Sequence, residues 1–233
     1  MNDGDKTTSI HSELRREVLR WLGQTSTVEA PEFELLEWFL QETEAQHAGM
    51  QAAEDQYIAE QQASGNPDVN DSGILAVKYY LRRVRYSQVI QLVSLLEDCL
   101  DTACENVRQI RKGQEALPFE VSELKGNQWS VKRKFLERYL GIEVPDHLGA
   151  PVRAIICVRN IIVHNNGKAD ALTPKERRKI DGMCHVGIDE ESRLVLDPEF
   201  LRSALQDVRA YVACIDAGLA TAAQQAMAPR PVT

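Results

Sequence analysis

The chain has 233 residues, of which 43% are hydrophobic and 27% charged, and its net charge is −8. This composition is typical of a globular protein rather than a disordered one, and the longest apolar stretches fall far short of the roughly 20 residues that cross a bilayer. The charge is uneven: residues 1–72 hold 4 Lys and Arg against 15 Asp and Glu, whereas residues 73–233 hold 23 against 20. Since phosphates respond to charge within a Debye length of about 8–10 Å, the second part is compatible with an RNA ligand.

The cysteines and the N-terminus indicate the compartment. Five cysteines include no C-x-x-C pair, which argues against a disulfide framework and against a zinc site. Residues 1–8 contain Asp3 and Asp5, with no positively charged segment before an apolar run, so they do not resemble a signal peptide. We therefore expect a cytoplasmic protein with reduced thiols, no metal and no cofactor.

Apolar periodicity predicts helices in the first half of the chain. A short helix fits residues 12–22, and a longer one begins at Pro31, which suits the first turn of a helix, and ends at the breaker run of residues 64–67. Residues 74–112 contain no Gly or Pro and place apolar side chains at steps of three and four, which predicts one long helix. Such a helix needs other long helices or a second subunit to pack against.

The second half completes an all-α fold. Helices are expected at residues 130–140, 150–164 and 198–227, and a further one begins at Thr173-Pro174 with an arrangement close to a capping box. Val186, Ile188, Leu194 and Leu196 alternate around a polar turn and predict one small β-hairpin. The predicted architecture is an antiparallel helical bundle with long helices and this hairpin near residues 186–196. Its expected parts are an acidic N-terminal helical extension (1–72), a helical domain (73–227) and a frayed tail (228–233).

The segment 151–167 contains the candidate functional residues. Its apolar side chains lie on nearly every side of the helix, which is typical of a buried or interface helix. They define a stripe whose central position is Arg159, and an arginine in an apolar seam requires a carboxylate or a phosphate partner. Asn160 and His164 lie one turn apart on the adjoining face.

Spacing alone leaves two interpretations of these residues open. In the structural one, Arg159 pairs with a core carboxylate such as Glu97, and His164 gains about 0.3–1 kcal/mol from the dipole at the helix C-terminus. Residues 165–167 would then be an ordinary C-cap. In the other, Arg159, Asn160 and His164 belong to a catalytic site.

Residues 159–167 read Arg-Asn, three apolar residues, His, then Asn-Asn-Gly. This pattern resembles the signature of the HEPN superfamily (higher eukaryotes and prokaryotes nucleotide-binding domains), in which Arg is followed after four to six residues by His, often with a polar residue next to the Arg. The upstream helix around residues 95–100 is similar to the antiparallel partner helix of that family. The resemblance covers about residues 74–170, less than half of the chain.

The resemblance implies a four-helix-type bundle that dimerises with its two motifs facing each other. In active members it implies a metal-independent endoribonuclease, often a toxin or an antiviral defence effector, whereas other members are non-catalytic. Carried over, Arg159 would stabilise charge on the scissile phosphate, Asn160 would orient the site, and His164 would be general acid or base during attack by the 2′-hydroxyl. Because positions five apart differ by about 140° around a helix, a composite site needs a distorted last turn or a second subunit, and the dimer explains the spacing better.

A basic and aromatic run on the long helix offers RNA contacts through Lys78, Arg82 and Arg85, and Lys168 follows the motif. The same run also fits a solvated helix face with tyrosines packed beneath it. The expected partners are RNA, a second copy of the chain and an antitoxin or regulatory protein, with no membrane. Two alternatives stay open: a catalytically silent helical module that binds a nucleotide, nucleic acid or partner protein, and a scaffold whose acidic N-terminal helices bind a partner.

Overall fold

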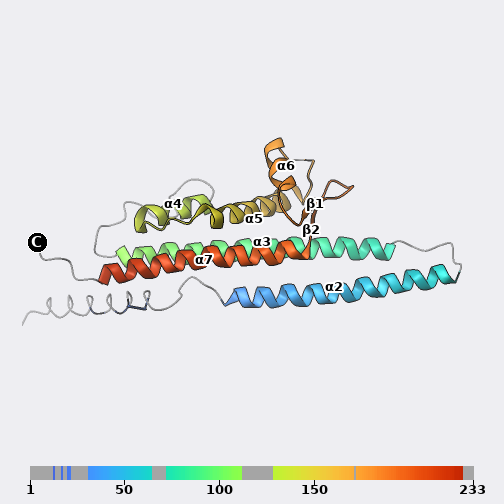
Figure 1. Ribbon diagram of the computed structural model, residues 1–233, viewed down its shortest axis with the longest axis horizontal. Coiled ribbons are helices and arrows are strands. Elements are labelled where there is room, and N and C mark those ends of the chain that lie inside the picture. The colour runs from blue at the N-terminus through green and yellow to red at the C-terminus, as the bar shows by residue number, and fades with distance from the viewer. Residues whose placement is uncertain are drawn as a thin grey trace, which may run out of the picture. The chain divides into compact units, whose positions relative to one another are not determined.

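The structure, a computed structural model, describes residues 31–64, 72–111, 128–170 and 172–227, together with Glu13, Glu17, Arg20 and Trp21. The helix expected at residues 12–22 lies largely outside the described residues, and the tail 228–233 lies wholly outside them. The labelled helices and strands of Figure 1 are α2 (Glu32–Ala63), α3 (Ser72–Arg111), α4 (Gln128–Leu140), α5 (Asp146–Asn165), α6 (Pro174–Asp181), β1 (Val186–Ile188), β2 (Leu194–Leu196) and α7 (Pro198–Met227). The predicted all-α fold with one small hairpin is therefore confirmed. Over these ranges, no helix has the length and apolarity needed to cross a bilayer.

The chain forms two compact units. Residues 1–30, 95–149 and 209–233 make up the first, and residues 31–94 and 150–208 make up the second. Helix α2, which the sequence assigns to an N-terminal extension, belongs to the second unit together with the first half of α3. Helices α3 and α7 contribute residues to both units.

The first unit buries apolar side chains from the second half of α3, from α4 and from the second half of α7. One buried charge lies among them: Lys132 Nζ pairs with Asp101 at 2.7 Å and donates to the carbonyl of Glu97 at 3.3 Å. Burial also raises the pKa of the nearby Cys104 thiol to about 12, which keeps that thiol protonated. The buried side chains of this unit include Leu96, Leu100, Val107, Phe135, Leu136, Tyr211, Ile215 and Leu219.

The second unit contains the motif, and the expected position of Arg159 at the centre of the apolar stripe is wrong. The buried face of α5 consists of Val152, Ile155, Val158, Ile161 and Ile162. Its centre is Val158, and Arg159 lies at the edge of this stripe, half-buried. Phe33, Leu36, Leu40, Val89, Leu92, Val93, Phe200, Leu201 and Leu205 supply much of the remaining core.

Two local features of α5 and α6 follow from their first residues. Helix α5 begins at Asp146, four residues before the expected start, with Pro151 inside it. Pro151 is the sixth residue of the helix and has no N–H, so one i→i−4 hydrogen bond of α5 is missing. Helix α6 begins with the predicted capping box, in which Thr173 Oγ1 accepts from Glu176 N and Glu176 accepts from Thr173 N.

Five residues, 189–193, separate the two strands of the hairpin, and Asp189 N donates to Arg193 O at 2.9 Å, which leaves a loop of three residues. Val186 pairs with Leu196 and Ile188 with Leu194. Ser192 N donates to Asp189 O at 3.0 Å, and Ser192 has a φ of 58°. This geometry matches a type I turn followed by a left-handed residue, which is a common connection for three-residue hairpin loops.

Candidate active site

The guanidinium of Arg159 has one N–H group without a hydrogen-bond acceptor among the described residues. Its Nη1 donates to Asn160 Oδ1 at 3.2 Å. Its Nε is enclosed and has no hydrogen-bond acceptor, and no carboxylate pairs with it among the described residues. A half-buried cation with an unused N–H has the charge and the donor that a phosphate oxygen requires.

His164 lies in the last turn of α5 and is exposed to solvent. Its neighbour Val163 is also exposed, at 45%. The helix remains α-helical through Asn165, so the last turn is not distorted in a way that would bring His164 onto the face of Arg159. Within one chain, the two side chains therefore keep the angular separation of about 140° expected from their spacing.

A tight turn ends α5 directly after His164. Asn166 and Gly167 have φ values of 52° and 73°, and Lys168 N donates to Asn165 O at 2.9 Å. Two successive positive φ values closed by such a bond are characteristic of a type I′ turn, for which Asn-Gly is the preferred pair. A side chain at position 167 would also overlap the ring of Tyr86, so glycine is required there for two separate reasons.

The hairpin closes over this turn. Leu194 N donates to Gly167 O at 2.9 Å, and Ala169 N donates to Ser192 O at 2.6 Å. From α3, the buried hydroxyl of Tyr86 donates to Leu194 O at 2.7 Å, and burial raises the pKa of Tyr86 to about 12. Tyr86 thus stays protonated and joins α3 to the hairpin.

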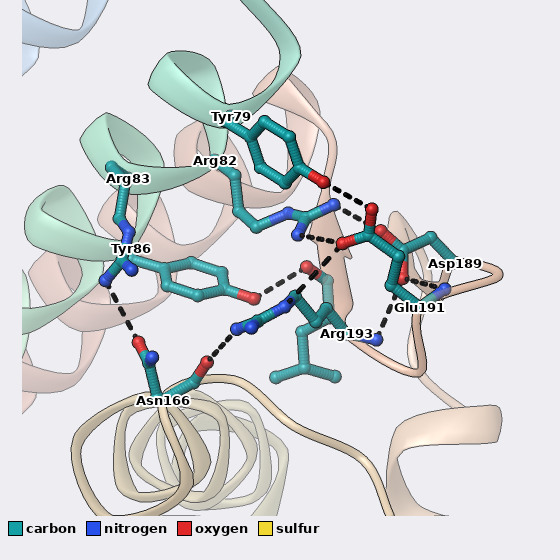
Figure 2. A network of polar contacts seen from close by, with 9 residues as sticks. Tyr79, Arg82, Arg83, Tyr86, Asn166, Asp189, Glu191 and Arg193 are labelled. Atoms are coloured by element: carbon teal, nitrogen blue, oxygen red, sulfur yellow. Dashed lines mark hydrogen bonds and ion pairs between the residues drawn. The ribbon is translucent and has the colours of Figure 1, made fainter. Parts of the chain in front are cut away.

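A network of charged side chains anchors the hairpin loop to α3 (Figure 2). Arg82, with a side chain only 8% exposed, pairs with the equally buried Asp189 and with Glu191 at 3.4 Å. Tyr79 Oη donates to Glu191 at 2.5 Å, and this hydrogen bond is the main cause that lowers the pKa of the Glu191 carboxyl. Asp189 also accepts the backbone N–H of Arg193 at 2.9 Å, so one carboxylate orders its own loop and neutralises Arg82.

The four candidate RNA contacts divide into two pairs. Arg82 is held by the hairpin carboxylates, and Arg85 forms a bidentate pair with Glu44 at 2.8 and 2.9 Å. Arg85 Nη1 also donates to Leu196 O at 2.9 Å. Both arginines therefore have intramolecular partners. Lys78 and Lys168 are exposed and have no ion pair within the described ranges.

Two arginines that were not among the candidates contact the turn after His164. Arg83 Nη1 donates to Asn166 Oδ1 at 3.0 Å, and Arg193 Nη1 donates to Asn166 O at 3.1 Å. Arg83 belongs to the basic run noted in the sequence, and its spacing there did not distinguish it from Arg82. Arg193 lies in the hairpin, and only the tertiary structure places it beside Asn166.

The described residues include no cluster of three or more His, Cys, Asp or Glu placed to hold a metal ion. Comparison of the chain with protein-family models, with curated proteins and with solved structures finds no match.

Proposed function

We propose that this protein is a metal-independent endoribonuclease of the HEPN type, acting in the cytoplasm as a toxin or defence effector held in check by an antitoxin or regulatory protein. The observation that carries the proposal is the state of Arg159. Its guanidinium is half-buried, and among the described residues it has no carboxylate partner and no acceptor for Nε. An RNA phosphate would supply both the opposite charge and the missing acceptor.

The chemistry follows from the residues of the motif. The 2′-oxygen attacks the adjacent phosphorus while its proton leaves to a base, and the bond to the 5′-oxygen breaks as that oxygen takes up a proton. His164 is suited to both proton transfers, because an imidazole can accept a proton at one step and donate it at the next. Arg159 stabilises the extra negative charge on the phosphate, and Asn160 holds Arg159 through its side-chain amide. The products are a 2′,3′-cyclic phosphate and a 5′-hydroxyl.

A dimer completes this site. Because α5 is regular through Asn165, one chain does not place Arg159 and His164 on one face. A two-fold axis near Asn160 would bring two copies of each residue around one cleft, and the exposed Val163 provides apolar contact area beside it. We expect an obligate interface of about 2,000 Å² or more, and light scattering that gives a monomer mass at every concentration would contradict it.

The decisive experiment is incubation of the purified protein with mixed cellular RNA in EDTA, followed by mapping of the cleaved ends. We expect cleavage with cyclic-phosphate and 5′-hydroxyl ends, which differ from the products of two-metal nucleases that use water. Activity that is lost in EDTA and restored by magnesium would show the mechanism to be wrong.

The matched variants are His164→Ala and His147→Ala, since both histidines are exposed residues of α5 and only the first lies in the motif. We expect His164→Ala to lower the cleavage rate by about 10² to 10⁴-fold and to change stability by no more than about 1 kcal/mol. His147→Ala should cut at the parent rate. A His164→Ala protein that melts and cuts like the parent would refute the catalytic assignment. A parent protein that binds RNA without cutting it would be the catalytically silent module.

A further inference from the structure

Three neighbouring arginines of α3 differ in what neutralises them. Arg82 is paired with Asp189 and Glu191, and Arg85 is paired with Glu44. Arg83 is exposed, and its hydrogen-bond partner among the described residues is the neutral side-chain amide of Asn166. A neutral acceptor orients a guanidinium without cancelling its charge, so Arg83 retains a full positive charge at the surface.

The position of Arg83 is fixed by the turn that follows His164. Arg83 Nη1 bonds to Asn166 Oδ1 at 3.0 Å, while the backbone of Asn166 is held in the left-handed region and its carbonyl accepts from Arg193. A guanidinium has five N–H donors, and the bond to Asn166 uses one of them. Among the described residues the other four have no hydrogen-bond partner, so they can bind an anion beside Asn166, which is two residues beyond the proposed catalytic histidine.

The charge around this turn is asymmetric. Figure 2 shows Asp189 and Glu191 gathered at the hairpin loop, on the far side of the network from Arg83 and Asn166. Lys168, which ends the turn and pairs with Arg193 through a β-bridge, is exposed and has no ion pair in the described part of the chain. Arg83 and Lys168 are thus both exposed cations without a carboxylate partner among the described residues.

We propose that Arg83 and Lys168 bind the phosphate backbone of the RNA strand next to the cleaved bond, and that Asn166 positions Arg83 for this contact. The inference rests on the proposed function, because it identifies the surface that holds the substrate of the same site. Arginine suits the role because its planar fork binds phosphate oxygens in a bidentate manner, while lysine contributes as a point charge.

The test measures binding without cleavage. A fluorescent single-stranded 2′-O-methyl oligoribonucleotide lacks the attacking hydroxyl, and its affinity is measured by anisotropy at several salt concentrations. We expect Arg83→Ala to bind about tenfold more weakly. The magnitude of the slope of log K against log salt should fall by about 0.7, which is the contribution of one phosphate contact on a single strand. Arg83→Lys should keep the slope, because the charge remains.

Two further variants separate binding from folding. Asn166→Gly accepts the positive φ and removes only the amide, so we expect weaker binding with an unchanged salt slope. Arg202→Ala is the matched control: Arg202 is an exposed arginine of the same unit, paired with Glu199 at 3.0 Å, and its loss should leave affinity and slope at the parent values. Thermal melts of all variants exclude unfolding as the cause.

The outcomes for the inference and for the proposed function are distinct. If Arg83→Ala binds the oligonucleotide with the parent affinity and salt slope, the inference is wrong even if the parent cuts RNA. If Arg83→Ala loses affinity and slope while the parent cuts no RNA at all, the binding surface stands and the nuclease proposal fails.

Discussion

Arg82 and Arg85 of α3 lie in the same compact unit as Arg159 of α5, and their surroundings are opposite to those of Arg159. Arg82 is buried against Asp189, and Arg85 lies in a bidentate pair with Glu44. Arg159 is half-buried, its hydrogen-bond partner among the described residues is a neutral amide, and its enclosed Nε has no acceptor there. A basic residue that has a carboxylate partner serves the fold, whereas one that is partly buried without such a partner has a free-energy reason to bind an anion.

The largest expected effect is the loss of stability when Arg82 of α3 is replaced. Arg82→Ala leaves Asp189 buried without its cation, and breaking a buried ion pair in this way costs about 3–5 kcal/mol of unfolding free energy. Urea denaturation of this variant and of the exposed control Arg202→Ala measures the cost. A loss below about 1 kcal/mol would mean that Asp189 finds another partner, and the division between the two groups of arginines would not hold.

Replacement of Arg159 in α5 should have the opposite effect: stability is nearly unchanged and cleavage is largely lost. Arg159→Ala removes a cation that leaves no carboxylate unpaired among the described residues, so we expect a change in stability of no more than about 1 kcal/mol. Its cleavage rate should fall by about 10² to 10³-fold, the usual effect of removing one charge-stabilising donor. Melting curves and cleavage assays on the same preparation measure both quantities. Destabilisation as large as that of Arg82→Ala would show that Arg159 is a structural residue.

A smaller effect is expected at the turn that connects the two regions. Gly167→Ala strains a residue with a φ of 73° and forces a methyl group into the ring of Tyr86, and together these should cost about 1–3 kcal/mol. Gly49→Ala is the matched control: Gly49 lies inside α2 with open space around it, and alanine there should stabilise the protein by roughly 0.5–1 kcal/mol. Equal stabilities for the two variants would contradict the role given to the turn.

The smallest expected effect is a pH dependence in α2, beside the Glu44–Arg85 pair. Burial lowers the pKa of His47 below its usual 6.5, and Arg85 adds to this while Glu44 opposes it. As the pH falls below about 6.5, the unfolded chain binds a proton that the folded chain does not, so this contribution to stability is lost as the pH falls toward the folded pKa. His47→Phe keeps an aromatic ring against Tyr80 and should lose less stability than the parent between pH 7.5 and pH 5.5 in urea unfolding.

The sequence predicted the features that depend on local chemistry. The capping box at Thr173, the hairpin and the bounds of the long helices to within a few residues all follow from turn residues and apolar spacing. Glycine at position 167, a stop signal in the sequence, is also required by the turn.

The remaining features depend on partners that are distant in the sequence. Arg82 and Arg83 are adjacent and chemically identical, and only contacts 107 and 83 residues away give one a carboxylate and the other an amide. The burial of Val158 in place of Arg159 depends on which face of α5 the other helices cover. No periodicity within a single helix contains that information.

The pairing between the turn after α5 and the hairpin also has a consequence for the order of events during synthesis. The end of α5 is fastened by contacts to residues 192–194 and, through Tyr86, by a bond that spans 108 residues of chain. Contacts of such large sequence separation form late in folding, because the chain entropy lost in closing the loop must be overcome first. A nascent chain that has emerged only as far as His164 would contain every residue of the motif. It would lack residues 192–194, which hold the end of α5 in place. We therefore expect the site to become ordered only after the hairpin has left the ribosome.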